Sequence, residues 1–166
     1  MLKDYYMNLL IWVLLFIIGV SDVQRNRIPN NLVIILLLIV VIDLFQTPGL
    51  LWTLHIKGML ITLGVGFGLY VVKAMAGGDV KLLTVVGLWL GAEVMWQVTA
   101  YVVVAGGIIG AFYLMLHMAS SGQSFKEHVK VYAVQRVTRG WSTQYPLVIP
   151  FAPAIVIGMA YYFYIF

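Results

Sequence analysis

The chain has 166 residues, of which 63% are hydrophobic and only 10% are charged, and its mean hydropathy is +1.00. This composition excludes an ordinary soluble protein and indicates a polytopic membrane protein, with residues 1–166 forming a single transmembrane domain. The net charge of +4 comes without a basic stripe interleaved with aromatics, and there is no cysteine, so we expect neither nucleic-acid binding nor disulfide or thiolate chemistry.

We predict an all-α fold with about six transmembrane helices. The first three spans cover about residues 5–21, 31–45 and 54–72, and the turn residues 46–49 end the second of them.

The apolar run that follows, residues 82–116, is too long for a single crossing, which needs about 20 residues. Gly91-Ala92-Glu93 is the predicted turn that divides it into a short fourth span and a fifth span from about Val94. The sixth span follows Pro146 and runs to Phe166.

Lys and Arg fall unequally on the two sides of this arrangement. With the N-terminus outside, Lys3 and Lys57 lie on the outer side. The inner loops hold Arg25, Arg27, Lys73, Lys81, Lys126, Lys130, Arg136 and Arg139. Because cytoplasmic loops carry the excess of basic residues, the distribution predicts an outside N-terminus.

Residues 120–140 form the one sizeable polar segment, and we expect it in the cytoplasm. Its apolar residues, such as Phe125 and Val129, recur at helical spacing among basic ones. Two interpretations remain open: a surface helix held to anionic membrane lipid, or a lid or docking surface for substrate.

Asp22 and Asp79 carry the strongest functional signal. A carboxylate at membrane depth costs about 2.5–3.5 kcal/mol to insert, which marks it as a functional candidate. Asp22 closes the first span and Asp79 opens the fourth, and spans two and three cross outward and return. Of the six acidic residues, only these two share the cytoplasmic side and a span end. We therefore expect them to meet.

Two neighbouring carboxylates can hydrolyse a peptide bond without a metal or cofactor, and we predict neither here. One activates a water and the other protonates the carbonyl oxygen, and the pair titrates as a unit because two close like charges cannot both ionise. His55, His117 and His128 are far apart and pair with no carboxylate at ligand spacing, so we interpret them as interfacial or solvated residues.

The residues around the aspartates have structural as well as functional interpretations. Gly77 and Gly78 would let an extended substrate approach Asp79, or would form a plain turn with Asp79 as helix N-cap. Lys81 lies beside the site, or snorkels to the membrane surface.

Two interpretations are open for Arg27 in the first loop: it orders the loop, or it only helps to set the orientation of the chain in the membrane. Pro29 ends this loop, and Asn30 is predicted to cap the second span.

Three motifs resemble the type IV prepilin peptidases, which are GxGD-type intramembrane aspartyl proteases. Residues 21–30 (SDVQRNRIPN) resemble the family's Asp followed by Arg-Ile-Pro-Asn, and residues 76–83 (AGGDVKLL) resemble its Gly-x-Gly-Asp-Val-Lys-Leu signature. Residues 149–154 (IPFAPA) are similar to its Pro-Phe-Gly-Pro segment. Ala76 and Ala152 stand where the family has glycine.

The resemblance implies that Asp22 and Asp79 are the catalytic pair. The implied substrate is a prepilin or pseudopilin with a short basic leader, a glycine before the cut and an apolar helix after it, cleaved on the cytoplasmic side of the inner membrane. The compact form resembles the peptidases of tight-adherence (Flp) pili or of archaeal preflagellins. Without a domain of Cys-x-x-Cys motifs, we expect peptidase activity and no methyltransferase activity.

Other classes stay open from the residues alone. A small transporter could use the two carboxylates as proton or cation sites. An inactive scaffold could keep the fold, and an intramembrane protease that cuts within a helix would share the chemistry with a different substrate. The oligomeric state and the division of acid and base roles between the two aspartates are left open.

Overall fold

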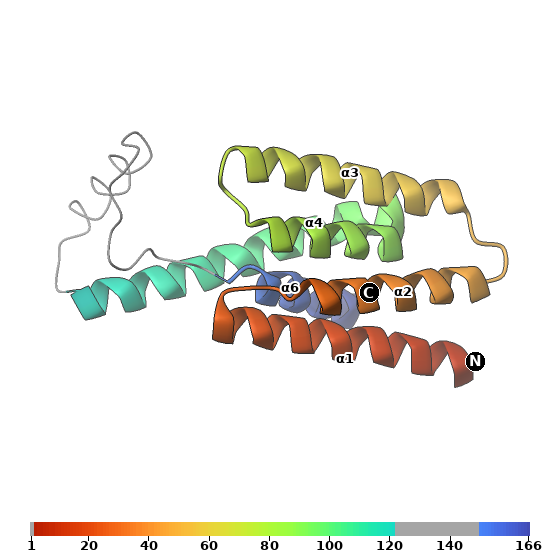
Figure 1. Cartoon of the computed structure of the whole chain (residues 1–166), viewed down its shortest axis with the longest axis horizontal. Coiled ribbons are helices and arrows are strands. Elements are labelled where there is room, and N and C mark those ends of the chain that lie inside the picture. Colours follow the sequence, from red (N-terminus) through yellow and green to blue (C-terminus); the bar gives the residue numbers. More distant parts are fainter. Residues whose placement is uncertain (1, 122–149) are drawn as a thin grey trace. The chain divides into compact units, whose positions relative to one another are not determined.

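The structure is a computed structural model that describes residues 2–121 and 150–166, so the predicted cytoplasmic segment, about 120–140, lies almost wholly outside the described residues. The described residues form helices joined by short loops, without any strand (Figure 1). The helices are α1 (Leu2–Arg25), α2 (Asn30–Gln46), α3 (Trp52–Val71), α4 (Gly77–Ser121) and α6 (Ala152–Ile165). For these residues the all-α prediction is confirmed.

Three of these helices, α1, α3 and α4, are long and apolar enough to cross a membrane, and α2 and α6 are shorter apolar helices. The chain divides into two compact units. Unit 1 comprises Met1–Gly106 and Pro150–Phe166, and unit 2 comprises Gly107–Ile149. The described part of unit 2 is the end of α4, where apolar side chains such as Phe112 and Met115 are exposed.

Helix α4 contains a backbone break at the position where a turn is predicted. Gly91 has φ 75° and ψ 170°, which are not helical values, and the helix direction changes there (Figure 1). Only glycine adopts this region readily, because a Cβ would collide with the backbone. Two helical segments result, residues 77–90 and residues 92–121.

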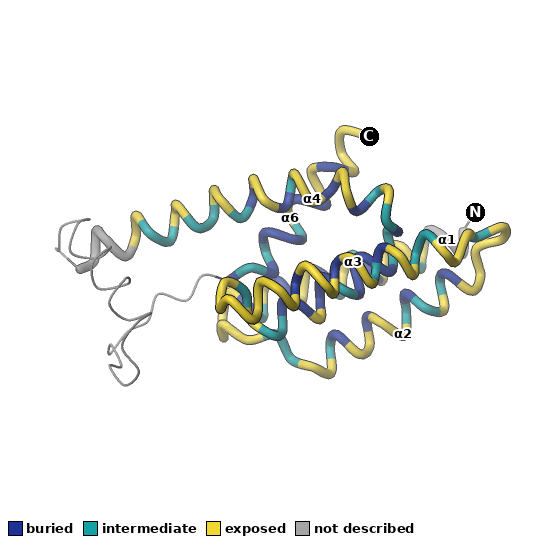
Figure 2. The backbone as a smooth tube through the Cα atoms, turned by 90° about the horizontal axis from the view of Figure 1, so that it is seen from above, coloured by how far each residue is buried: buried dark blue, intermediate teal, exposed yellow. Residues whose placement is uncertain are grey.

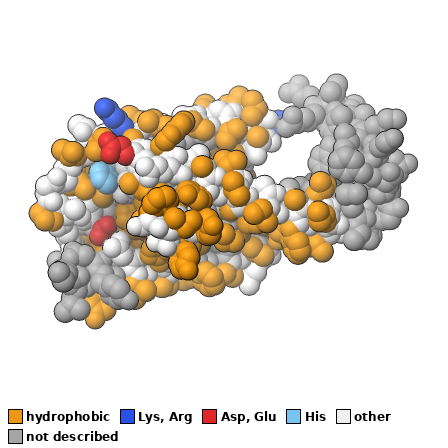
Figure 3. All heavy atoms as spheres, turned by 180° about the vertical axis from the view of Figure 1, so that it is seen from behind, with side chains coloured by type: hydrophobic (Ala, Val, Ile, Leu, Met, Phe, Trp, Pro, Cys, Tyr) orange, Lys and Arg blue, Asp and Glu red, His pale blue; other side chains and the backbone are white. Residues whose placement is uncertain are grey.

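Buried side chains follow helical spacing within unit 1 (Figure 2). Ile11, Leu15 and Ile18 form one fully buried face of α1, which packs against α2 and α6. The rest of the surface remains strongly apolar, and few charged side chains are visible on the face in Figure 3. Lipid tails are as apolar as leucine, so close van der Waals packing rather than escape from water holds such helices together.

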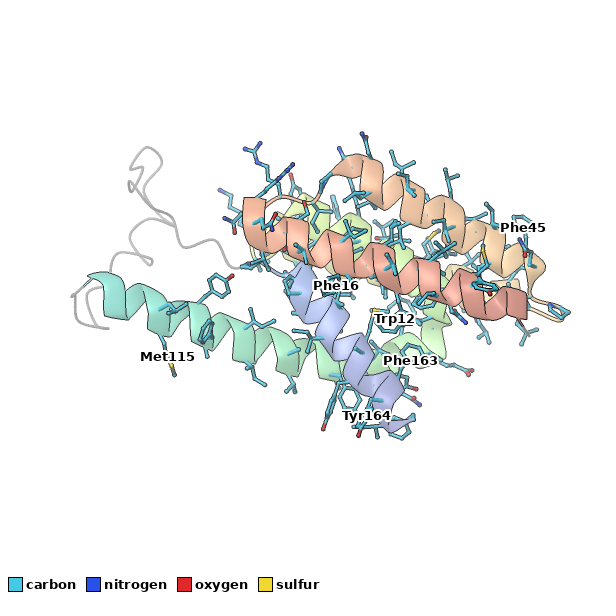
Figure 4. All side chains as sticks on the ribbon, turned by 90° about the horizontal axis from the view of Figure 1, so that it is seen from below. Trp12, Phe16, Phe45, Met115, Phe163 and Tyr164 are labelled. Atoms are coloured by element: carbon cyan, nitrogen blue, oxygen red, sulfur yellow. The ribbon has the colours of Figure 1, made fainter. Side chains whose placement is uncertain are left out.

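Aromatic contacts join the helices that also carry the candidate site. Trp12 of α1 and Phe163 of α6 point toward one another, with ring centroids 5.9 Å apart (Figure 4). Trp89 of α4 lies 6.1 Å from Trp12 in an edge-on arrangement. This cluster fixes α1, the first segment of α4 and α6 relative to one another.

Small residues create a close helix contact at a position that the sequence did not single out. A Cβ on Gly58 of α3 would lie 2.7 Å from the Gly91 carbonyl carbon and would also meet the Gly87 carbonyl oxygen. By contrast, Gly64 and Gly68 of α3 have no neighbouring atom within 4 Å of the position that a Cβ would take. Gly66, which lies between them in the sequence, does pack closely, because its Cβ would lie 3.1 Å from the Val80 side chain.

Two adjacent glycines in the second segment of α4 also differ in the space around them. A Cβ on Gly106 would lie 3.4 Å from the Phe151 ring, whereas Gly107 has open space at that position.

Candidate active site

Asp22 lies inside the last turn of α1, which continues to Arg25 and therefore ends later than the predicted first span. The helix closes when the Asn26 N–H donates to the Asp22 carbonyl oxygen at 2.8 Å, with Asn26 in the left-handed region at φ 49°. Asparagine tolerates this conformation at helix ends. The side chain of Asp22 is only 5% exposed.

The Asp22 carboxylate is held by the start of α6. The Ala152 backbone N–H donates to Asp22 Oδ2 at 3.0 Å in a buried hydrogen bond. Ala152 is the first residue of α6, so its N–H has no acceptor within the helix, and the next residue, Pro153, has no N–H. The free donor at this helix end is thus supplied to the carboxylate.

Asp79 is the third residue of α4 and is 6% exposed. Its N–H donates to the Ala76 carbonyl oxygen at 3.1 Å, as does the N–H of Val80 at 3.3 Å. Ala76 therefore occupies the position before the helix, and the alternative that Asp79 is the N-cap is wrong.

The two aspartates come together from distant parts of the sequence. Both belong to unit 1, and Asp22 acts electrostatically on Asp79. They are the buried acidic side chains of the described residues. Their burial in one unit and this electrostatic interaction support the expectation that they come together, and two desolvated carboxylates that lie close can share one proton.

The loop that follows Asp22 (residues 26–29) and the loop that precedes Asp79 (residues 72–76), the two aspartate loops, are joined through the helices that begin after them. Lys81 Nζ donates to Asn30 Oδ1 at 2.9 Å, which links the first turn of α4 to the start of α2. Asn30 is the first residue of α2, while Pro29 takes the N-cap position without a side-chain hydrogen bond, so the predicted Asn30 cap is wrong. The Arg27 side chain is exposed on the same loop.

The glycines before Asp79 lie close to other side chains of the chain, and their predicted role of admitting an extended substrate stays a prediction. Neither Gly77 nor Gly78 has a positive φ. A Cβ on Gly78 would lie 3.1 Å from Ile28 Cβ, and one on Gly77 would lie 3.6 Å from the Tyr70 ring. The chain's own Ile28, from the loop after α1, is what approaches Gly78 closely.

Sequence reasoning missed the parts played by Ala152 and Ile28. The motif around Ala152 was visible, but only the fold reveals that its N–H reaches Asp22.

Among residues 2–121 and 150–166, no group of three His, Cys, Asp or Glu side chains could hold a metal ion. His55 instead bonds through Nδ1 to the Leu88 carbonyl oxygen at 2.9 Å, beside the break in α4.

The model of the type IV leader peptidase family matches residues 9–115. The chain belongs to this family. The matched region contains both aspartates, Asn30 and Lys81, and ends before α6. No curated protein and no solved structure gives a significant match. As a type IV leader peptidase family protein with long apolar helices, the chain is a membrane protein with a peptidase fold and a buried aspartate pair.

Proposed function

We propose that this protein is an aspartyl endopeptidase that removes the short basic leader from type IV prepilins or pseudopilins. The observation that carries the proposal is the pairing of Asp22 and Asp79, two buried carboxylates that interact within unit 1. Family membership supports the peptidase class, and the pair supplies a chemistry for it.

In this proposal the protein crosses the cytoplasmic (inner) membrane six times, with its N-terminus outside. The crossings are α1, α2, α3, the two segments of α4 and α6. The break at Gly91 supports two crossings in α4, because the outer end of that hairpin requires a turn. Both aspartates then lie near the cytoplasmic surface, where a basic leader ends and an apolar helix begins.

The mechanism uses one shared proton. The ionised carboxylate takes a proton from a water molecule while the oxygen of that water attacks the carbonyl carbon of the scissile bond. The protonated carboxyl gives its proton to the carbonyl oxygen, and a proton then passes to the leaving amine as the C–N bond breaks. The bond from Ala152 holds Asp22 Oδ2 in place, and the carboxylate keeps further lone pairs for the water or the shared proton.

The test is cleavage of co-expressed prepilins, read as the size shift on leader loss, by the wild-type protein and by Asp22→Asn and Asp79→Asn. Asparagine keeps the shape of the side chain and removes its titrating proton. We expect each variant to insert in the membrane and to lose cleavage by about 10²–10⁴-fold, the usual contribution of a general acid or base. Glu93→Gln, at an exposed acid beside the Gly91 break, is the matched control and should keep activity.

Cleavage that survives either aspartate variant would refute the two-carboxylate mechanism at that residue. If the inserted wild-type protein leaves every prepilin intact, the substrate assignment is wrong. Proton or cation flux into vesicles that depends on both aspartates would then favour the transporter alternative.

A further inference from the structure

Unit 1 contains a cavity of about 260 Å³ beside the candidate site. Its walls come from α3, from both segments of α4 and from Phe151. The lining is apolar apart from two threonines, Thr62 and Thr99. An engineered cavity of about 150 Å³ is large enough for benzene, so this space suits one large side chain and is too small for a helix.

The polar atoms of both threonines are already used. Thr62 Oγ1 donates to the Gly58 carbonyl oxygen at 2.8 Å, and Thr99 Oγ1 donates to the Met95 carbonyl oxygen at 2.7 Å. Each bond stays within its own helix, so the cavity gains no free donor from either hydroxyl. A polar ligand would leave its own groups unsatisfied there, and the cavity therefore selects an apolar occupant.

Three lining residues connect the cavity directly to the backbone that holds the carboxylates. Leu83 follows Asp79 by four residues, which is about one helical turn or 6 Å along the axis on the same face. Met75 adjoins Ala76, whose carbonyl accepts the Asp79 N–H. Phe151 adjoins Ala152, whose N–H binds Asp22.

We propose that this cavity is a substrate subsite, which receives an apolar side chain from the first four residues after the scissile bond. The inference rests on the proposed function, since it assigns a specificity pocket to that reaction. Continuity with both aspartate loops favours the substrate over a lipid acyl chain. The rim residues Ile61, Val65 and Val103 are exposed, so a substrate helix lying in the membrane reaches the cavity from the side.

The experiment compares two neighbouring valines of the same helix. Val103 lines the cavity and is 64% exposed, whereas Val104 does not line it and is 60% exposed. The full-length wild-type protein, Val103→Phe and Val104→Phe are assayed on one cleaved prepilin. Each of the first four residues after the cut in that substrate is replaced, one position at a time, by Ala, Leu or Phe.

At one position we expect the wild-type protein to favour Leu or Phe over Ala by about tenfold in kcat/KM, a usual value for apolar pockets. Val103→Phe fills the cavity, so Ala should then be favoured over Leu or Phe at that position, mainly because KM rises for the larger side chains. Val104→Phe should keep the wild-type preference. Equal slowing of all substrates by Val103→Phe would overturn the proposal and indicate an acyl chain or a structural void. So would a wild-type protein that cleaves without any preference at the four positions.

If the proposed function is wrong, the wild-type protein cleaves no prepilin at all, and the subsite proposal is then wrong as well. If the wild-type protein cleaves prepilins but shows no side-chain preference after the cut, only the subsite proposal is wrong.

Discussion

Gly77 and Gly78 precede Asp79 together, yet the space around them differs. A Cβ on Gly78 would lie 3.1 Å from Ile28 Cβ, while the nearest atom for Gly77 would be 3.6 Å away, an ordinary van der Waals distance. We therefore expect Gly78→Ala to push Ile28 and its loop away from Asp79 and to reduce cleavage by about tenfold or more, the effect of a small displacement at a reacting centre. Gly77→Ala should cost clearly less in the same assay, and equal losses would contradict this explanation.

The bond between Lys81 and Asn30 joins the two aspartate loops, but both side chains are exposed. Solvent weakens such a bond, so its coupling energy should stay within about 0.2–1 kcal/mol, or at most about fivefold in rate. Lys81→Met and Asn30→Leu should each slow cleavage modestly, and the double variant should be no slower than either one. Fully multiplicative effects in this double-mutant cycle would show that the bond does not position the loops.

Helices α3 and α4 depend on one close approach of their backbones. A Cβ on Gly58 would overlap the Gly87 carbonyl oxygen and lie 2.8 Å from the Ala92 nitrogen, where only backbone movement can relieve the contact. Gly58→Ala should lower the free energy of unfolding by about 1–3 kcal/mol, the usual cost of overpacking. Gly64→Ala on the same helix meets nothing within 4 Å and should be neutral or slightly stabilising. Thermal unfolding in detergent compares the two, and equal melting temperatures would refute the contact.

The helices could be predicted because each follows from local composition. Apolar runs, turn residues and the limit on crossing length gave the helices from α1 to α4 within a few residues, together with the break at Gly91. The contacts between helices could not be predicted in this way. Nothing local distinguishes Gly58, which is tightly packed, from Gly64, which is open, because the difference lies in the opposing helix.

The candidate site could likewise be predicted from the sequence only in part. The predicted topology places Asp22 and Asp79 at the same side of the membrane, since both stand at ends of predicted spans. The donor from Ala152 was not predictable, because a backbone N–H has no sequence signature and its direction depends on how α6 packs against α1. The two buried carboxylates could thus be singled out from the sequence, whereas the backbone N–H that bonds to Asp22 could not.

At the scale of the whole molecule, the backbone break at Gly91 underlies the proposal that the chain crosses the membrane six times. An unbroken helix of 45 residues would be about 68 Å long at 1.5 Å per residue, more than twice the hydrocarbon thickness of about 30 Å. The values φ 75° and ψ 170° at Gly91 interrupt it in a region that is accessible almost only to glycine. The break therefore permits two crossings by α4, in agreement with the turn predicted from the sequence at Gly91-Ala92-Glu93.

The chain has no cysteine, so single introduced cysteines report this topology without background. Thr47→Cys follows α2 and Glu93→Cys lies beside the Gly91 break, at the two ends proposed to face outward. Gln24→Cys lies in the last turn of α1 and Ala74→Cys in the loop before α4, at the two ends proposed to face the cytoplasm. The two cytoplasmic cysteines should resist an impermeant maleimide until the membrane is permeabilised. With six crossings, the outward pair labels in intact cells. A single crossing by α4 would bury position 93 in lipid, so failure of Glu93→Cys to label under either condition would refute the hairpin and, with it, the placement of both aspartates at one membrane surface.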